Sequence, residues 1–189
     1  GMYFEHDGYV DAPIPTFAGS RDQLPEPVLE KDPGYVDMYW RAWEIGFDHI
    51  KRPPEGSPFV TNFLDEAFSY KIFQWDTVFM TLFARYGHHI FPAIDSFDNF
   101  YARQHKSGYI CREIVESDGR DFAFNLWDDT INPPLFAWAE VESYRVTGDK
   151  SRFARVLPVL EKYAEWLEAH RRKEDTVHGL FWNTPLGSG

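Results

Sequence analysis

The feature that most limits how this chain can fold is the spacing of its apolar residues, which recur every three or four positions in five separate segments. This spacing places apolar side chains on one face of an α-helix, whereas a half-buried strand would show alternation. The segments cover about residues 36–52, 75–86, 92–104, 135–146 and 150–172. The pattern therefore predicts an all-α fold with about five main helices and little strand.

Each predicted helix is expected to bury its apolar stripe, because tertiary packing supplies most of the stability of helices in proteins. The residues expected to face the core are Tyr39, Trp40, Trp43, Phe47 and Ile50 in the first helix, Trp75, Phe79, Leu82, Phe83 and Tyr86 in the second, Ile94, Phe97 and Tyr101 in the third, Leu135, Trp138, Val141 and Tyr144 in the fourth, and Phe153, Val156, Leu157, Leu160, Tyr163, Ala164 and Leu167 in the fifth.

The connections between the helices differ strongly in length. Residues 1–34 are rich in proline and glycine and predict an irregular N-terminal arm with at most short pieces of structure. Residues 53–74 predict a loop that can hold short strands, and residues 105–132 form a long connection of a kind that is usually functional. By contrast, Thr147-Gly148-Asp149 predicts a helix stop followed by an N-cap. We therefore expect antiparallel helix pairs in residues 35–189, with tight turns at one end and a loop-built cleft at the other.

The sharpest local motif is Gln74-Trp75-Asp76-Thr77 at the start of the second helix. Asp76 there is favoured by the positive end of the helix dipole, and Trp75 suits a core position. Taken alone, the motif is explained better by these structural roles than by a binding site.

Other candidate residues lie in the long loops or next to helix ends. They are Gln104, Arg112, Glu113, Asn132 and Trp182. Each has an ordinary explanation, since adjacent charges such as Arg112 and Glu113 form solvated loop pairs by default. Asn132-Pro133-Pro134 also suits a simple helix start. Together with Trp75 and Asp76, however, these residues fall on the side expected to form the cleft.

From about Trp75 to Gly189 the chain resembles the glycoside hydrolases built on a six-hairpin (α/α)6 toroid. It is similar to glycoside hydrolase family sixty-three and the mannosylglycerate-hydrolase-like domains, and more distantly to family thirty-seven trehalases. The resemblance rests on the order and spacing of the Trp75-Asp76 pair, Asn132-Pro133-Pro134 and Thr147-Gly148-Asp149. It implies that residues 35–189 form about half of the toroid.

The resemblance also implies roles for the candidate residues. Trp75 would stack on the sugar that is cleaved off, and Asp76 would accept hydrogen bonds from its hydroxyls. Gln104, Arg112 and Asn132 match positions that bind the same sugar, Glu113 stands beside Arg112, and Trp182 would line the cleft. The implied chemistry is inverting hydrolysis, in which one carboxylic acid protonates the leaving oxygen and a second carboxylate activates water.

The chain departs from the family pattern in its catalytic residues. The acid of the family is an aspartate that follows a segment like Gly187-Ser188-Gly189, and the base is a glutamate much further along. Both are expected beyond residue 189, so no catalytic residue is assigned and the chain is interpreted as a fragment or a truncated product. A half-toroid would expose the apolar surface meant for the other helices, so self-association is expected.

Composition excludes several other classes of protein. The net charge of −11 would repel a phosphate backbone, so nucleic acid is not an expected partner. The apolar runs are too short to cross a membrane, and the compartment is left open. A single cysteine, Cys111, excludes an intramolecular disulfide and lacks a recognisable base partner. No metal or cofactor is expected, because His88 and His89 are adjacent on a helix and have no partner four residues away.

Two alternatives stay open. Phenylalanine, tryptophan and tyrosine together make up 18% of the chain. A non-catalytic carbohydrate-binding module would use such aromatic residues and would need no carboxylate pair. A helical-repeat interaction protein would also pack helices side by side, although it requires neither a Trp-Asp pair at a helix start nor long polar loops.

Overall fold

The computed structural model describes residues 2–122, 129–173 and 177–184, and these are mostly helical. The α-helices are α1 (Phe17–Ser20), α2 (Pro33–Asp48), α3 (Gln74–Ala84), α4 (Asp98–Ala102), α5 (Phe136–Thr147) and α6 (Ser151–Arg171), with short 3-10 helices at Arg21–Gln23, Arg85–Gly87 and Ile94–Phe97. This confirms the mostly helical fold predicted from the apolar spacing. The segment Gly187-Ser188-Gly189 lies outside the described residues.

Strand is confined, in the described residues, to two small antiparallel pairs. β1 (Ile50–Lys51) pairs with β2 (Phe63–Leu64), and β3 (Lys71–Phe73) pairs with β4 (Glu113–Val115). The first helix therefore ends earlier than predicted, because the chain enters β1 at Ile50. β4 lies inside the connection that was expected to be a loop, and β3 leads directly into α3.

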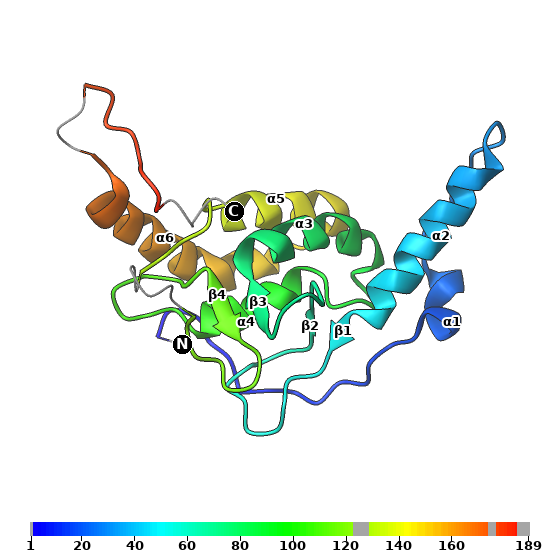
Figure 1. The fold of residues 1–189 in the computed structure, drawn as a ribbon, viewed down its shortest axis with the longest axis horizontal. Coiled ribbons are helices and arrows are strands. Elements are labelled where there is room, and N and C mark those ends of the chain that lie inside the picture. Colours follow the sequence, from blue (N-terminus) through cyan, green and yellow to red (C-terminus); the bar gives the residue numbers. More distant parts are fainter. Residues whose placement is uncertain (1, 123–128, 174–176, 185–189) are drawn as a thin grey trace.

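α3, α5 and α6 lie on one side of the strands, with α3 and α5 next to each other and α6 antiparallel to α5 (Figure 1). The turn between α5 and α6 is the one predicted from the sequence. Gly148 ends α5 in the left-handed conformation (φ +69°), and Asp149 accepts hydrogen bonds from the backbone N–H and the hydroxyl of Ser151. α2 projects from the body with α1 packed against it (Figure 1).

The main core lies between the β3–β4 pair, α4, α5 and α6. Its central rings are Phe97, Phe100, Tyr101, Phe136 and Tyr163, all almost inaccessible to solvent. A smaller cluster around Trp43, Phe47 and Phe91 joins α2 to the segment after α3. The predicted inward positions Ile94, Phe97 and Tyr101 are confirmed, although they lie on a 3-10 helix followed by the short α4 rather than on one long helix.

The predicted buried faces of α3 and α5 are wrong in part. Trp75, Leu82, Leu135 and Tyr144 are half-buried. Phe79 and Phe83 of α3, Tyr86 of the 3-10 helix that follows it, and Trp138 and Val141 of α5 are exposed, and we call these five residues the apolar face. The buried residues are instead Gln74, Thr77, Val78, Thr81 and Ala84 in α3 and Phe136, Ala139, Glu140 and Ser143 in α5. The reason is that the two helices pack against each other and the core through small and polar side chains, which turns their larger apolar residues outward.

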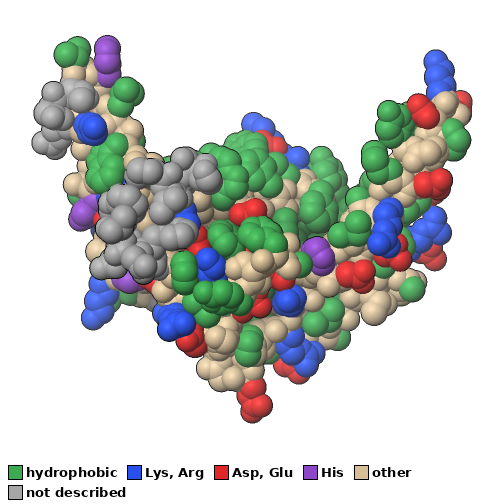
Figure 2. Space-filling model, viewed as in Figure 1, with side chains coloured by type: hydrophobic (Ala, Val, Ile, Leu, Met, Phe, Trp, Pro, Cys, Tyr) green, Lys and Arg blue, Asp and Glu red, His purple; other side chains and the backbone are tan. Residues whose placement is uncertain are grey.

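The apolar face lies in a hollow between two projecting parts of the molecule (Figure 2). Part of the apolar face, including Phe79 and Phe83, lines an open groove of about 610 Å³ between α2 and α3, together with residues such as Tyr39 and Trp43. In α6, Val156, Tyr163 and Leu167 are buried as predicted, whereas Leu157 and Ala164 are exposed because Val159 and Trp166 fill the core positions.

No helix in the described part of the chain is long and apolar enough to cross a bilayer.

Candidate functional site

The pairing of β3 with β4 fixes where α3 begins. Glu113, the first residue of β4, lies opposite the end of β3, and α3 follows β3 without a break at Gln74. The backbone N–H of Gln74 donates to the carbonyl oxygen of Arg112 at 2.8 Å. The first turn of α3, which carries Trp75 and Asp76, is therefore held beside Arg112 and Glu113.

The segment that precedes α5 is attached to the same place. The backbone N–H of Trp75 donates to Asn132 Oδ1 at 3.3 Å, and the backbone N–H of Arg112 donates to the carbonyl oxygen of Thr130 at 3.3 Å. Segments far apart in the sequence thus meet at the N-terminal end of α3. The structure gathers there five of the residues singled out from the sequence: Trp75, Asp76, Arg112, Glu113 and Asn132.

Gln104 has different surroundings. Its side-chain amide donates to the carbonyl oxygens of Gly108 and Val159, both at 2.9 Å, and the residue is buried. These bonds tie the turn after α4 to α6. In this structure the side-chain NH2 group of Gln104 therefore hydrogen-bonds to backbone carbonyl oxygens.

Arg112 and Glu113 are buried, which rules out the solvated loop pair considered from the sequence. The Glu113 carboxylate, fully inaccessible to solvent, forms ion pairs with Arg112 and with Lys71, whose Nζ lies 2.5 Å from Glu113 Oε2. Lys71 Nζ also lies 3.7 Å from the centre of the Phe122 ring, a cation–π distance. One buried carboxylate thus pairs with two cations next to the start of α3, and Lys71 was not among the residues predicted from the sequence.

The Asp76 carboxyl is half-buried at this site. Burial raises its pKa, and the negative charge of Glu113 raises it further, while a hydrogen bond from its own backbone N–H opposes both. A carboxylate that is partly removed from water and has few partners gains from hydroxyl donors. Asp76 is therefore placed to accept hydrogen bonds from a hydroxyl-rich ligand.

A second carboxyl near Asp76, Glu66, was not predicted. Its two carboxylate oxygens are inaccessible to solvent, and burial raises its pKa to about 8, helped by the charges of Asp65, Asp76 and Glu116. The following residue, Ala67, has a φ of +64°, the left-handed region that residues other than glycine seldom adopt. Nothing in the local sequence distinguishes Glu66 from a surface acid.

We expect Glu66 to make the chain less stable as pH rises. A carboxyl whose pKa rises on folding, here from 4.5 to about 8, binds its proton more tightly in the folded state. Its contribution to the free energy of unfolding therefore falls as pH increases between those values. Thermal unfolding measured from pH 5 to pH 8 should show that Glu66→Gln gains stability relative to the unmodified chain as pH rises.

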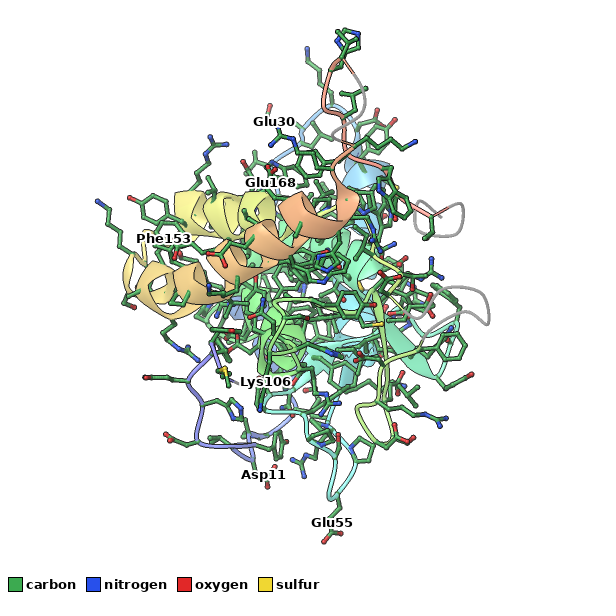
Figure 3. The ribbon with its side chains drawn as sticks, turned by 90° about the vertical axis from the view of Figure 1, so that its left-hand side faces the viewer. Asp11, Glu30, Glu55, Lys106, Phe153 and Glu168 are labelled. Carbon is green, nitrogen blue, oxygen red and sulfur yellow. The ribbon has the colours of Figure 1, made fainter. Side chains whose placement is uncertain are left out.

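The matched control for this measurement is Glu55→Gln, because Glu55 lies at an exposed loop tip and points into solvent (Figure 3). This control should follow the unmodified chain at every pH. Parallel pH curves for Glu66→Gln and the unmodified chain would contradict the assignment.

A pocket of about 390 Å³ adjoins this site through Asn132. We call it the Trp182 pocket; it lies between the segment before α5, the C-terminal part of α6 and the last described loop. Residues that line it are Asn132, Pro134, Leu167, Arg171, Phe181 and Trp182. Glu168, another lining residue, lies on the C-terminal part of α6, toward this loop (Figure 3). The structure therefore places Trp182 in a concave surface next to the residues at the start of α3.

Arg171, which was not predicted as a site residue, contacts residues on several sides of the Trp182 pocket. Its guanidinium lies 4.7 Å from the ring of Trp166 and 4.6 Å from the ring of Trp182. It also donates to the carbonyl oxygen of Asp129 at 2.6 Å and forms an ion pair with the Asp129 carboxylate at 3.1 Å. The backbone N–H of Trp182 donates to the carbonyl oxygen of Arg171 at 2.8 Å.

Comparison with known proteins yields two findings. A model of the mannosylglycerate hydrolase MGH1-like glycoside hydrolase domain matches residues 70–189. An uncharacterized protein of Borreliella burgdorferi is 31% identical over 151 residues, which is 79% of this chain. The matched stretch spans 31% of that relative's own length. The domain match begins just before β3 and includes both the start of α3 and the Trp182 pocket.

Proposed function

The chain belongs to the family of mannosylglycerate hydrolase MGH1-like glycoside hydrolase domains, and on that premise we propose that it forms the sugar-binding part of an enzyme that hydrolyses an O-glycosidic bond with inversion. The observation that carries the proposal is the meeting of Trp75, Asp76 and Asn132 at one end of α3. These residues combine a flat aromatic ring with carboxylate and amide groups.

The chemistry of the three residues suits a sugar. A pyranose ring has apolar faces that stack on an aromatic ring, and its hydroxyls donate to carboxylate oxygens. When ionised, Asp76 would accept stronger hydrogen bonds from these hydroxyls than a neutral group would. The buried group of Lys71, Arg112 and Glu113 would fix the position of the first turn of α3 rather than contact the sugar.

No catalytic residue is proposed within the chain. In an inverting glycosidase a carboxylic acid protonates the leaving oxygen, while a carboxylate on the other side of the ring activates water. We expect neither group among the residues described, as the family resemblance implies. The name of the family makes a glycoside of glycerate one candidate substrate, and the matched stretch spans only 31% of the relative, so the activity of the whole protein stays a proposal.

We also propose that the helices belong to one part of an (α/α)6 toroid. The tight α5–α6 turn and the long connections supplying the candidate site at the opposite end of the helices support this arrangement. The apolar face also supports it, since further helices packed there would cover exposed rings such as Trp138.

The experiment that tests the proposed function is calorimetric titration of the purified chain with methyl α-D-mannopyranoside and methyl α-D-glucopyranoside. We expect one of the two to bind and Trp75→Ala to weaken that binding. Circular dichroism would verify that the variant is folded. If neither glycoside binds, or if Trp75→Ala binds unchanged, the sugar-site proposal is wrong.

The apolar face leads us to expect that the isolated chain self-associates. Neighbouring exposed apolar residues that form a large patch on a soluble protein usually mark an interaction surface. Sedimentation velocity over a wide range of concentrations should show faster-sedimenting species as concentration rises, and Phe79→Ser should reduce them. Leu157→Ser, which removes an exposed leucine from α6 outside the apolar face, serves as the control. A chain that is monomeric at every concentration would refute this expectation.

A further inference from the structure

The Trp182 pocket has the size and shape of a ligand subsite. Its volume of about 390 Å³ lies within the usual range for small-molecule sites. Its walls are largely apolar and include two aromatic rings, Phe181 and Trp182, both partly exposed. A flat ring could stack on such a wall, and partly exposed aromatic rings gain most when a ligand covers them.

The pocket is joined to the proposed sugar site by Asn132. This residue lines the pocket, while its Oδ1 accepts the backbone N–H of Trp75. The Trp182 pocket therefore adjoins the start of α3 through a residue that contacts both.

The charges of the pocket favour a neutral occupant. Among its described lining residues the only cation is Arg171, and this side chain is nearly inaccessible, lies against Trp166 and Trp182, and is paired with Asp129. The other charged lining residue is Glu168, which would repel a carboxylate. An anionic group such as glycerate would find no cation available to it in this lining.

We propose that the Trp182 pocket is the subsite for the leaving portion of the substrate, and that it takes a neutral ring, such as a second sugar or an aryl group, rather than the glycerate carboxylate. This inference rests on the proposed function, because it names the second half of the same substrate. Arg171 is the positioning residue that fixes Trp182 in the wall of the subsite.

The test is titration of the purified chain with three glycosides of one sugar: the methyl glycoside, the p-nitrophenyl glycoside and the glycerate glycoside. The set is prepared from both D-mannose and D-glucose in the α configuration. The p-nitrophenyl glycoside should bind about tenfold more tightly than the methyl glycoside, as stacking of one aromatic ring allows. The glycerate glycoside should gain nothing over the methyl glycoside.

Variants of the pocket separate its contribution from that of the sugar site. Trp182→Ala should remove the preference for the aryl glycoside, and Phe181→Ala provides a second variant if Trp182→Ala does not fold. Arg171→Gln should also reduce the preference, while Arg172→Gln, at the neighbouring exposed arginine, should retain it. Tryptophan fluorescence should report a changed environment in Arg171→Gln but not in Arg172→Gln.

The outcomes distinguish the two proposals. Binding of the methyl glycoside without an aryl preference, or tighter binding of the glycerate glycoside, overturns the subsite and leaves the sugar site standing. Aryl-glycoside binding that depends on Trp182, while Trp75→Ala binds every glycoside as tightly as the unmodified chain, supports the subsite and contradicts the sugar site. If no glycoside binds, both proposals are wrong.

Discussion

Replacement of Asp76 by alanine is expected to weaken binding of the sugar by about 10- to 100-fold. The half-buried carboxylate has room to accept hydrogen bonds from sugar hydroxyls, and a hydrogen bond to a charged group contributes about 1.5–3 kcal/mol. A buried hydroxyl without its acceptor loses that amount. Calorimetric titration with the methyl glycoside that the unmodified chain binds would measure the loss.

The controls for Asp76 separate binding from helix stability. Asp76→Ala also removes a carboxyl group from the first turn of α3, where the helix dipole favours a negative charge and burial disfavours it, so thermal unfolding of the variant is measured alongside binding. Asp76→Asn retains the side-chain shape and should lose less affinity than alanine. Asp37→Ala, at an exposed acid of α2, should leave binding unchanged. Equal and small losses in Asp76→Ala and Asp37→Ala would show that Asp76 does not contact the sugar.

The sequence predicted where the helices lie better than which way they face. The spacing of apolar residues and the stop at Gly148 located α5 and α6 to within a few residues. The same spacing assigned Phe79 and Trp138 to the core, whereas both are exposed. Periodicity identifies the more apolar face of a helix, but it does not show which neighbouring element covers that face.

The sequence predicted those residues of the candidate site that belong to a short local motif. It did not predict residues whose interaction partners are distant in the sequence. Trp75 and Asp76 stand out because they open a helix. Lys71, Glu66 and Arg171 acquire their roles from chain segments far away in the sequence, such as Asp129 for Arg171. A single sequence carries no record of such pairings, so these charged residues look like ordinary surface positions.

For the same reason, the sequence did not predict a buried network of ion pairs between α4, α5 and α6. Arg152 Nε lies 2.7 Å from Glu140 Oε2, and Arg152 Nη2 lies 2.9 Å from Asp98 Oδ1. Nη2 also donates to the carbonyl oxygen of Ile94 at 3.1 Å, and Tyr101 donates to Glu140 Oε1 at 2.9 Å. These charged side chains take core positions that the apolar pattern had given to larger hydrophobic residues.

Removal of Arg152 is therefore expected to cause the largest loss of stability of any single substitution considered. Arg152→Met would leave Glu140 and Asp98 buried without their counter-charge, a change that costs about 3–5 kcal/mol. Burial already raises the pKa of Asp98 to about 6 despite the nearby Arg152 charge. Chemical denaturation followed by circular dichroism would measure the change in the free energy of unfolding.

The loss in Arg152→Met should also depend on pH in a definite direction. Without Arg152 the pKa of Asp98 should rise further, so the folded variant binds a proton over a wider pH range than the unmodified chain. Stability then falls with rising pH, and the deficit should be larger at pH 8 than at pH 5. Arg155→Met is the matched control, because Arg155 is half-exposed and lies 3.5 Å from the same Asp98. An exposed pair of this kind contributes at most about 1 kcal/mol, so equal losses in the two variants would contradict a structural role for the buried network.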